Sequence, residues 1–449
     1  MPTCLREHPF EKAGPWRVRS WAGKSLPSIL SDYRSIPWEA RLLIYLSFVP
    51  SVVFGFIYTD LSFFLPRVQG LSNFWMGVTI GVMAISLVVT SFPLGIIADR
   101  YGRRRMLILG NAAASLSLIG FALTANLALV LLVAAVEGIG EAAFAVSGSA
   151  LLADKAGDEK RTLAFSLIAF LGWIAGALGG FAVSSVIPLQ SLGLNVAQAH
   201  VALYLIVGLL GLSVTPLILR ITETPRHSGE TQLGTRGFLP RKSARVLIRF
   251  STYSIMIAVG AGLFVPLMAN WFFHAYGVTD EVSAPVLGFS SILTAVAVFL
   301  SPKLASKFGL MQAIVMSQGL STVFMAVVPT SPTFGIAASI YTVRVFLMNL
   351  SNPLSQSLIM GLVSSDERGM ASGLSASLWR LPNALSSTVG AIWIGLGLLA
   401  LPFYVATVLY VSAIVSFWFL FKGTRLPEES RETARTLSSS IEEESVAAL

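Results

Sequence analysis

The sequence predicts an all-α integral membrane protein with twelve transmembrane helices, arranged as two pseudo-symmetric bundles of six. Over 449 residues the chain is 54% hydrophobic and only 12% charged, whereas soluble domains carry about 25% charged residues. Its apolar runs are about 20 residues or longer and do not alternate, which indicates helices rather than a barrel. The two halves also repeat each other in sequence, which predicts two equivalent bundles.

Polar turns divide the apolar sequence into twelve runs. An even number of membrane crossings places both termini on the same side. We place the spans at about 42–66, 74–98, 106–125, 127–153, 162–187, 200–222, 246–273, 284–304, 310–328, 333–358, 369–398 and 402–422.

Positive charge is distributed on one side of this map. Of the 31 Lys and Arg residues, only Arg67 falls in a loop that we place on the external side, and Arg344 and Arg380 fall inside spans. The remainder lie in the termini, in the alternate loops or at the adjoining helix ends. Since cytoplasmic loops are enriched in Lys and Arg, we expect a cell-membrane protein with both termini cytoplasmic. The net charge of +8 is explained by this orientation and does not indicate a nucleic-acid partner.

The polar segments predict the domain organisation. The region between the halves is basic and rich in proline and glycine, and the charged, serine-rich end of the chain is typical of a disordered tail. Cys4 is the single cysteine, so no disulfide can form within the chain. We expect a cytoplasmic segment at 1–40, a six-helix bundle at 41–222, a cytoplasmic linker at 223–245, a second bundle at 246–425 and a tail at 426–449.

A shift of 207 residues aligns the second half with the first, without gaps from the first helix to the fifth. Gly70 then falls on Gly277, and Gly102 falls on Gly309. The segment PKLASKFG becomes a degraded copy of GIIADRYG. Because this repeat is independent of composition, it supports the division into two bundles of like topology.

One turn between spans carries a distinctive pattern, GIIADRYGRRR, from Gly95 to Arg105. An acid and four arginines cannot lie in hydrocarbon, so the segment must form a turn at a membrane surface. The pattern closely resembles the signature between helices 2 and 3 of the major facilitator superfamily. The resemblance implies a gating role for Gly95, Asp99, Arg100, Gly102, Arg103 and Arg104.

The resemblance to this superfamily covers roughly residues 41–425 and implies two bundles that rock about a central site. It also implies that Asp99 meets the N-terminus of helix 11, near Gly369 and Met370, where the helix dipole favours an acid. The second copy of the signature has Ser306 in place of Asp99, so the first copy should carry most of the gating function. A structural turn is the alternative for Asp99.

Five charged residues fall inside the predicted spans: Asp60, Glu137, Glu141, Arg344 and Arg380. Ionisable residues at membrane depth are costly, so each is a functional candidate. The 207-residue shift carries Glu137 onto Arg344, and the resemblance implies that their helices, 4 and 10, line a central cavity. The two residues would face each other across it and could pair until substrate or a proton separates them. Arg344 would suit an anionic group; a static ion pair is the alternative.

The other buried charges have less specific readings. Glu141 lies one turn from Glu137, and two carboxylates so placed would not readily ionise together, which suits a proton carrier; it could instead face a neighbouring helix or water. Asp60 lies about 9 Å below the outer end of helix 1. The resemblance suggests a proton site there, although hydration near the interface would also explain it. Arg380, beside Pro382, could serve substrate binding or gating, or could pack against a carbonyl freed by the proline.

Other features favour different transporter classes. Tyr58 and Tyr341 lie on cavity helices and could touch substrate. The element beginning at Glu223, ETPR, resembles a motif of sugar and organic-acid porters. A glycine series on helix 5 resembles a motif of antiporters, with Ala177 where that motif has proline, although close helix packing is sufficient to explain it. These glycines are Gly172, Gly176, Gly179 and Gly180.

We therefore expect a secondary active transporter that works by alternating access and uses the proton gradient, without a cofactor or a metal. Uptake of a sugar or organic acid is the first hypothesis, and multidrug efflux in exchange for protons is the second. A non-transporting membrane sensor is a minor alternative. The partners would be a small-molecule substrate, protons and the lipid bilayer, and the chain would act as a monomer. An enzyme is not expected, since no buried metal-ligand cluster is apparent and the histidines fall in or near loops: His8, His200, His227 and His274.

Overall fold

The computed structural model describes residues 35–223, 244–363 and 368–422. The chain divides into two compact units, Met1–Ile36 and Pro37–Leu449, and the second unit is the one described below. Most of the predicted cytoplasmic segment 1–40 and linker 223–245, and all of the tail 426–449, lie outside the described residues.

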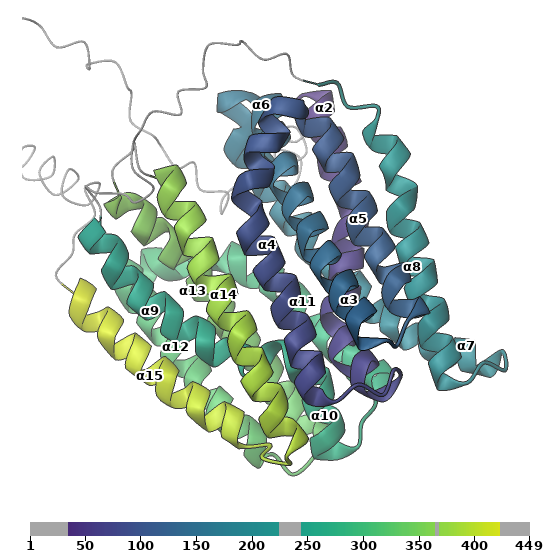
Figure 1. Cartoon of the computed structure of the whole chain (residues 1–449). Coiled ribbons are helices and arrows are strands. Elements are labelled where there is room, and N and C mark those ends of the chain that lie inside the picture. Colours follow the sequence, from purple (N-terminus) through teal and green to yellow (C-terminus); the bar gives the residue numbers. More distant parts are fainter. Residues whose placement is uncertain (1–34, 224–243, 364–367, 423–449) are drawn as a thin grey trace, which may run out of the picture. The chain divides into compact units, whose positions relative to one another are not determined.

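The described part of the second unit is helical (Figure 1). The first half contains α2 (Trp38–Leu46), α3 (Phe48–Arg67), α4 (Asn73–Tyr101), α5 (Arg103–Leu123), α6 (Leu127–Ala182), η2 (Val183–Ser185), α7 (Val186–Ser191) and α8 (Val196–Ile218). The second half contains α9 (Ala244–Gly262), η3 (Val265–Leu267), α10 (Met268–Tyr276), α11 (Asp280–Phe308), α12 (Leu310–Val327), η4 (Val328–Thr330), α13 (Phe334–Leu362), α14 (Arg368–Gly395) and α15 (Leu401–Phe421).

Eleven stretches of the described chain are long and apolar enough to cross a membrane. Two of them lie wholly or mostly in α6, which is kinked: Gly157 adopts φ 68° and ψ 168° and breaks the helical path between the fourth span, Leu127–Gly157, and the fifth, Leu163–Ser191. The predicted span that is missing from these eleven is the eleventh, 369–398. It corresponds to α14, a helix of 28 residues that carries Arg380 at mid-length and packs along α4 and α9. The prediction of an all-α membrane fold is confirmed.

Helix boundaries confirm the sequence repeat. A shift of 207 residues carries both ends of α4 onto the ends of α11, and the starts of α5 and α6 onto the starts of α12 and α13. Gly102 and Gly309 both have positive φ, at 109° and 82°, where they join consecutive helices. Gly70 and Gly277 also match, at 73° and 68°. Only glycine adopts such angles without strain, so these turns explain why the repeat retains glycine there.

Two ends of the bundle can be defined from these turns. The basic end carries the turns at Gly102 and Gly309, beside Arg103 and Lys307. The far end carries the turns at Gly70 and Gly277.

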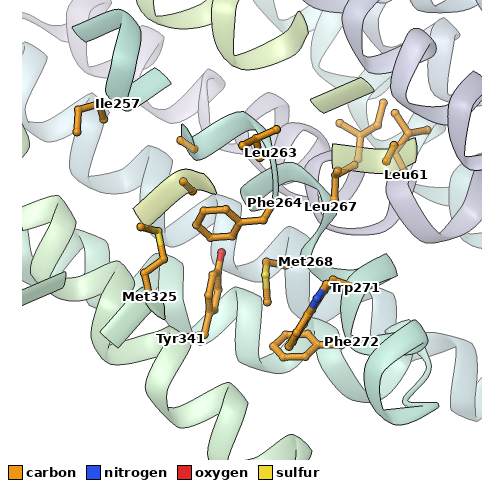
Figure 2. Close-up of a cluster of buried hydrophobic side chains, with 14 of the residues drawn as sticks. Leu61, Ile257, Leu263, Phe264, Leu267, Met268, Trp271, Phe272, Met325 and Tyr341 are labelled. Carbon is orange, nitrogen blue, oxygen red and sulfur yellow. The ribbon is translucent and has the colours of Figure 1, made fainter. Parts of the chain in front are cut away.

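The seventh predicted span, 246–273, is interrupted in the structure. It consists of α9 and α10, which are separated by a short 3₁₀ turn at Val265–Leu267. Pro266 has no N–H to donate and its ring would clash with the carbonyl of Gly262, which disfavours continuation of the α-helix. Gly262 also lies so close to the carbonyl of Asn383 that a Cβ there would overlap it. The break places Phe264 and Trp271 in a buried hydrophobic cluster that includes residues of both halves, such as Leu61 of α3 (Figure 2).

Small residues let the halves approach at two equivalent interfaces. Between α4 and α14, a Cβ on Gly77 would lie 2.6 Å from the Cα of Thr388. Between α11 and α6, a Cβ on Gly288 would lie 2.9 Å from the carbonyl oxygen of Ala177. These glycines lie in the parts of α4 and α11 nearest the far end, and Figure 1 shows α4 and α14 converging in that direction.

The glycines of the fifth span, which lies in the C-terminal part of α6, serve close packing. Added Cβ atoms on Gly55 of α3 and Gly179 of α6 would overlap the backbone of the opposing helix. Gly180 faces the Cα of Gly288 in the second half. The same glycine series therefore packs one face of the fifth span against α3 and another face against α11.

Candidate substrate and coupling site

An ion pair joins the halves at mid-depth. Arg380 of α14 donates from Nη1 to Oε1 of Glu141 on α6 at 2.8 Å. Both residues lie more than ten residues from either end of their spans, which corresponds to at least about 18 Å of helix. The side chains of Arg380 and Glu141 are 41% and 23% exposed. A charged pair that crosses between the halves while remaining accessible is suited to rearrangement when the halves move.

Glu137 lies one helical turn from Glu141 but in a different environment. It is 4% exposed, and its Oε2 has no hydrogen-bond partner among the described residues. Glu141 and Arg380 are both within electrostatic range of its carboxyl group. A buried carboxylate oxygen without a hydrogen-bond partner is costly. A proton or a cationic ligand would remove that cost.

Arg344 does not pair with Glu137 in this structure. Its Nη2 donates to the hydroxyl of Tyr410 at 3.0 Å, and its guanidinium lies 5.0 Å from the ring centre of Phe264. The side chain thus turns into its own half, where two aromatic groups hold it. The equivalence of Glu137 and Arg344 in the repeat correctly predicts burial of both, at 4% exposure each, but not the direction of the arginine.

The two candidate tyrosines are placed differently. Tyr58 is 47% exposed and within electrostatic range of Arg344 and Arg380. Its ring stacks on that of Phe54, one turn away on α3, with centroids 5.8 Å apart. Tyr341 is buried in the hydrophobic cluster shared by the two halves, beside Phe272 (Figure 2). Substrate contact is open to Tyr58 in this conformation, and for Tyr341 it stays a prediction.

Asp60 belongs to a cluster that the sequence did not reveal. It is completely buried, so the alternative of a hydrated residue near the interface is wrong. Nε2 of His200 lies 3.8 Å from Oδ1 of Asp60 and 2.9 Å from Oδ2 of Asp280. The three side chains form a buried set of possible metal ligands. The prediction that there is no buried metal-ligand cluster is therefore wrong, and Asp280 joins Asp60 and Glu137 as a buried acid among the described residues.

Early helix starts explain this error. The sixth span was predicted to begin at residue 200, but α8 begins at Val196. Asn195 caps it, with reciprocal bonds to Gln198 that form a capping box. Such a box marks a helix start in sequence, and recognising it would have placed His200 one turn inside. Likewise α11 begins at Asp280 rather than near residue 284.

The basic turn between α4 and α5 is held by acids from three directions. Arg103 pairs with Asp99 at 3.1 Å and with Asp154 of α6. Glu223 accepts hydrogen bonds from the backbone N–H groups of Arg103 and Arg104 at 2.8 and 3.1 Å. The acid of the ETPR element therefore caps the N-terminus of α5, where free N–H groups and the helix dipole favour a carboxylate.

The remaining gating candidates have supporting positions. Arg104 donates to the carbonyl of Ile221 at 3.1 Å, just beyond α8. Gly95 lies near Val146 of α6, and Arg100 is exposed. The side chains around Gly369 and Met370 lie outside the described residues, so the predicted contact of Asp99 with that helix start stays a prediction.

Comparison with known families defines the class of protein. The sequence profile of the Major Facilitator Superfamily matches residues 43–387. The chain belongs to this superfamily, and it is a membrane transporter rather than an enzyme.

Individual relatives are distant. The chain is similar to Multidrug resistance protein 2 of Bacillus subtilis, with 24% identity over 77% of this chain and 86% of that protein. It is also 31% identical to the uncharacterized MFS-type transporter YqjV of the same organism, over 26% of this chain and 29% of that protein. Among solved structures, the nucleoside transporter NupG shares the fold with a TM-score of 0.69 and 16% identity, over 86% of this chain and 99% of that one.

Proposed function

We propose that this transporter exports amphipathic organic compounds across the cell membrane in exchange for protons, by alternating access. The observation that carries the proposal is the pair of carboxylates on α6: one is buried with its Oε2 lacking a hydrogen-bond partner among the described residues, and the other is bound to Arg380 across the halves. The basic end would face the cytoplasm, as the distribution of Lys and Arg favours. One chain contains both halves of the site, so we propose that it works as a monomer.

The chemistry follows from the two carboxylates. Glu137 in its apolar position favours a neutral form or a cationic partner. Glu141 is held by Arg380 while the halves are arranged as here. Movement of α14 relative to α6 would separate that pair and leave Glu141 available to a proton or to substrate. Exchange of protons for substrate at one pair of acids would couple the two fluxes.

Exposed aromatic side chains and the relatives support an amphipathic cargo. Phe54 and Tyr58 present a stacked aromatic surface near the charged groups, and aromatic faces bind apolar and cationic groups alike. Three similar proteins carry names of multidrug resistance or efflux: Multidrug resistance proteins 1 and 2 of Bacillus subtilis and the pump PmrA of Streptococcus pneumoniae. The helix 5 glycines also fit an antiporter.

Proton-coupled uptake of a sugar or organic acid is the second candidate. The exposed guanidinium of Arg380 favours it, because an arginine in an accessible site can bind a carboxylate in a bidentate manner. Arg344, which the sequence indicates as the residue for an anionic group, is directed toward Tyr410 instead.

Transport into proteoliposomes distinguishes the two candidates. We would impose a proton gradient and supply lipophilic cations, organic acids or neutral sugars, with an internal pH-sensitive dye. Export predicts proton counterflow with lipophilic cations, lost in Glu137→Gln. Glu39→Gln is the matched control, since Glu39 pairs with Lys155 inside the first half at 2.6 Å. Co-transport of protons with acids or sugars, lost in Arg380→Gln, would replace the export proposal with uptake.

A further inference from the structure

The cluster of Asp60, His200 and Asp280 joins the two halves near the far end. Asp60 on α3 and His200 on α8 belong to the first half, and Asp280 is the first residue of α11 in the second. All three are buried, and one ligand atom from each lies within 4.8 Å of the others. Rings of Phe63 and Phe64 lie beside the imidazole, at 6.0 and 6.3 Å between centroids. The cluster is therefore enclosed by apolar groups.

Hydrogen bonding determines which histidine nitrogen faces the acids. Nδ1 of His200 lies 2.8 Å from the carbonyl oxygen of Val196, which only accepts, so Nδ1 carries a hydrogen. Nε2 therefore faces the carboxylates: when protonated it donates to Oδ2 of Asp280 at 2.9 Å, and when deprotonated it offers its lone pair to a metal ion. Metal-binding histidines typically donate their other N–H to a carbonyl or carboxylate in this way.

His200 is the cationic partner of these two buried acids when it is protonated; with a neutral imidazole they have no positive partner within the cluster. Neither oxygen of Asp60 has a hydrogen-bond partner among the described residues, nor has Oδ1 of Asp280 or the neighbouring hydroxyl of Tyr204. With a neutral imidazole the three ligands carry two negative charges in an apolar site. One divalent cation would neutralise them and occupy the unused lone pairs.

The donor set fits a small transition-metal ion. Imidazole nitrogen and carboxylate oxygen are zinc ligands, with bonds of about 2.0–2.2 Å. In a tetrahedral site such bonds place ligand atoms about 3.3 Å apart. The separations of 2.9 and 3.8 Å from Nε2 of His200 lie on either side of that value. Small rotations of the two carboxylates would bring all three atoms onto one ion.

We propose that Asp60, His200 and Asp280 bind a divalent transition-metal ion of the Zn²⁺ class, which holds the far ends of the two halves together. Because the ligands come from both halves, binding would stabilise the conformation with the far end closed and slow the transport cycle. Metal binding itself requires no substrate, so this inference stands apart from the proposed cargo.

The equivalent interface supplies a neutral comparison. The 207-residue shift carries Asn73 onto Asp280, and Asn270 of α10 donates to the side-chain oxygen of Asn73 at 2.9 Å. This bond also joins the halves at the far end, but through two amides. One interface thus closes without charge, and the other presents three metal ligands.

Zinc binding to the purified full-length chain in lipid nanodiscs tests the site. We expect one tightly bound Zn²⁺ per chain, and at least about a tenfold loss of affinity in His200→Gln and in Asp280→Asn. His274→Gln is the matched control, because His274 lies at the far end beside Arg67, outside the cluster. Wild-type affinity in His200→Gln, or loss in His274→Gln, would overturn the assignment.

Two measurements address the case in which a variant fails to fold. X-ray absorption at the zinc edge of the wild-type protein should show oxygen and nitrogen ligands with one imidazole; absence of imidazole would overturn the site. Spin labels at Leu192 and Leu398, in a Cys4→Ser background, report the distance between the halves at the far end. Zn²⁺ should shift the distribution toward the shorter distance; an unchanged distribution would contradict closure by the metal.

Discussion

At the scale of single residues, equivalent positions in a repeat do not have equivalent partners. Glu137 and Arg344 occupy matching sites, and both are buried. Arg344 is held by Tyr410 and Phe264 of its own half, whereas Glu137 leaves one oxygen without a partner. This asymmetry suits a transporter in which one half supplies an acid that can change its partner.

Tyr410→Phe is expected to destabilise the protein. Nε of Arg344 already has no partner among the described residues, and the substitution would leave Nη2 without one as well. A buried group that loses its hydrogen bond costs about 1–3 kcal/mol. Thermal unfolding in detergent measures the effect, with Tyr404→Phe as the control, since Tyr404 lies on the same helix and is 45% exposed. Equal melting temperatures for the two variants would show that the tyrosine bond does not hold Arg344.

At the scale of helices, chain breaks and caps decide which residues meet. The capping box at Asn195 brings His200 to Asp280, and the break at Pro266 creates the buried aromatic cluster around Phe264. The ETPR acid, Glu223, ties the end of the first half to the start of α5. Motifs that distinguish transporter classes by sequence therefore have local structural roles here.

Glu223→Ala is expected to destabilise the start of α5. The substitution removes a carboxylate that accepts two backbone N–H groups, and the loss of a helix cap costs about 0.5–2 kcal/mol. Ser191→Ala serves as the control, because its hydroxyl bonds only a carbonyl in an exposed turn. Hydrogen exchange of the amides of residues 103–106 should increase in the Glu223 variant. Unchanged exchange there would contradict the capping role.

Two glycines of one helix should respond oppositely to the same change. Gly179→Ala introduces a Cβ that would overlap the backbone of Val52, and overpacking of this kind costs about 1–3 kcal/mol. Gly172→Ala meets nothing closer than 3.7 Å and should be neutral or slightly stabilising. Melting temperatures of both variants test this. Similar melting temperatures would show that α3 and α6 pack less closely than described.

At the scale of the whole molecule, the two halves contact through small residues, two amides and a charged cluster near the far end. An ion pair joins them at mid-depth. Weak interactions of these kinds can break and reform together, as alternating access requires. The halves are held closely together near the far end. The orientation of the chain in the membrane therefore determines which side of the membrane this closed end faces.

Labelling of Cys4 should establish the orientation. As the single cysteine, it reports the side on which the predicted segment 1–40 lies. A membrane-impermeant maleimide should leave it unmodified in intact cells and modify it after permeabilisation. Leu192→Cys in a Cys4→Ser background is the control, since Leu192 lies in a far-end loop and is 80% exposed; it should be labelled in intact cells. The reverse pattern would invert the topology.

Much of the architecture follows from local sequence. Long apolar runs predict membrane spans, and those spans are helical because an unpaired backbone cannot remain in hydrocarbon. Gly102 and Gly309 mark turns whose positive φ angles only glycine adopts easily. The burial of Glu137 and Arg344 follows from their depth in those runs. Such properties depend on a residue and its near neighbours along the chain, so the sequence alone determines them.

The partners of buried groups were decided only by tertiary structure. Asp60, His200 and Asp280 lie up to 220 positions apart in sequence, and nothing in their local patterns indicates that they meet. The pairing of Arg380 with Glu141, rather than of Arg344 with Glu137, depends on which face each helix turns toward the other half. Helix rotation and crossing depend on side-chain packing over many residues, and for that reason the ligands of the proposed metal site appear only once the helices are assembled.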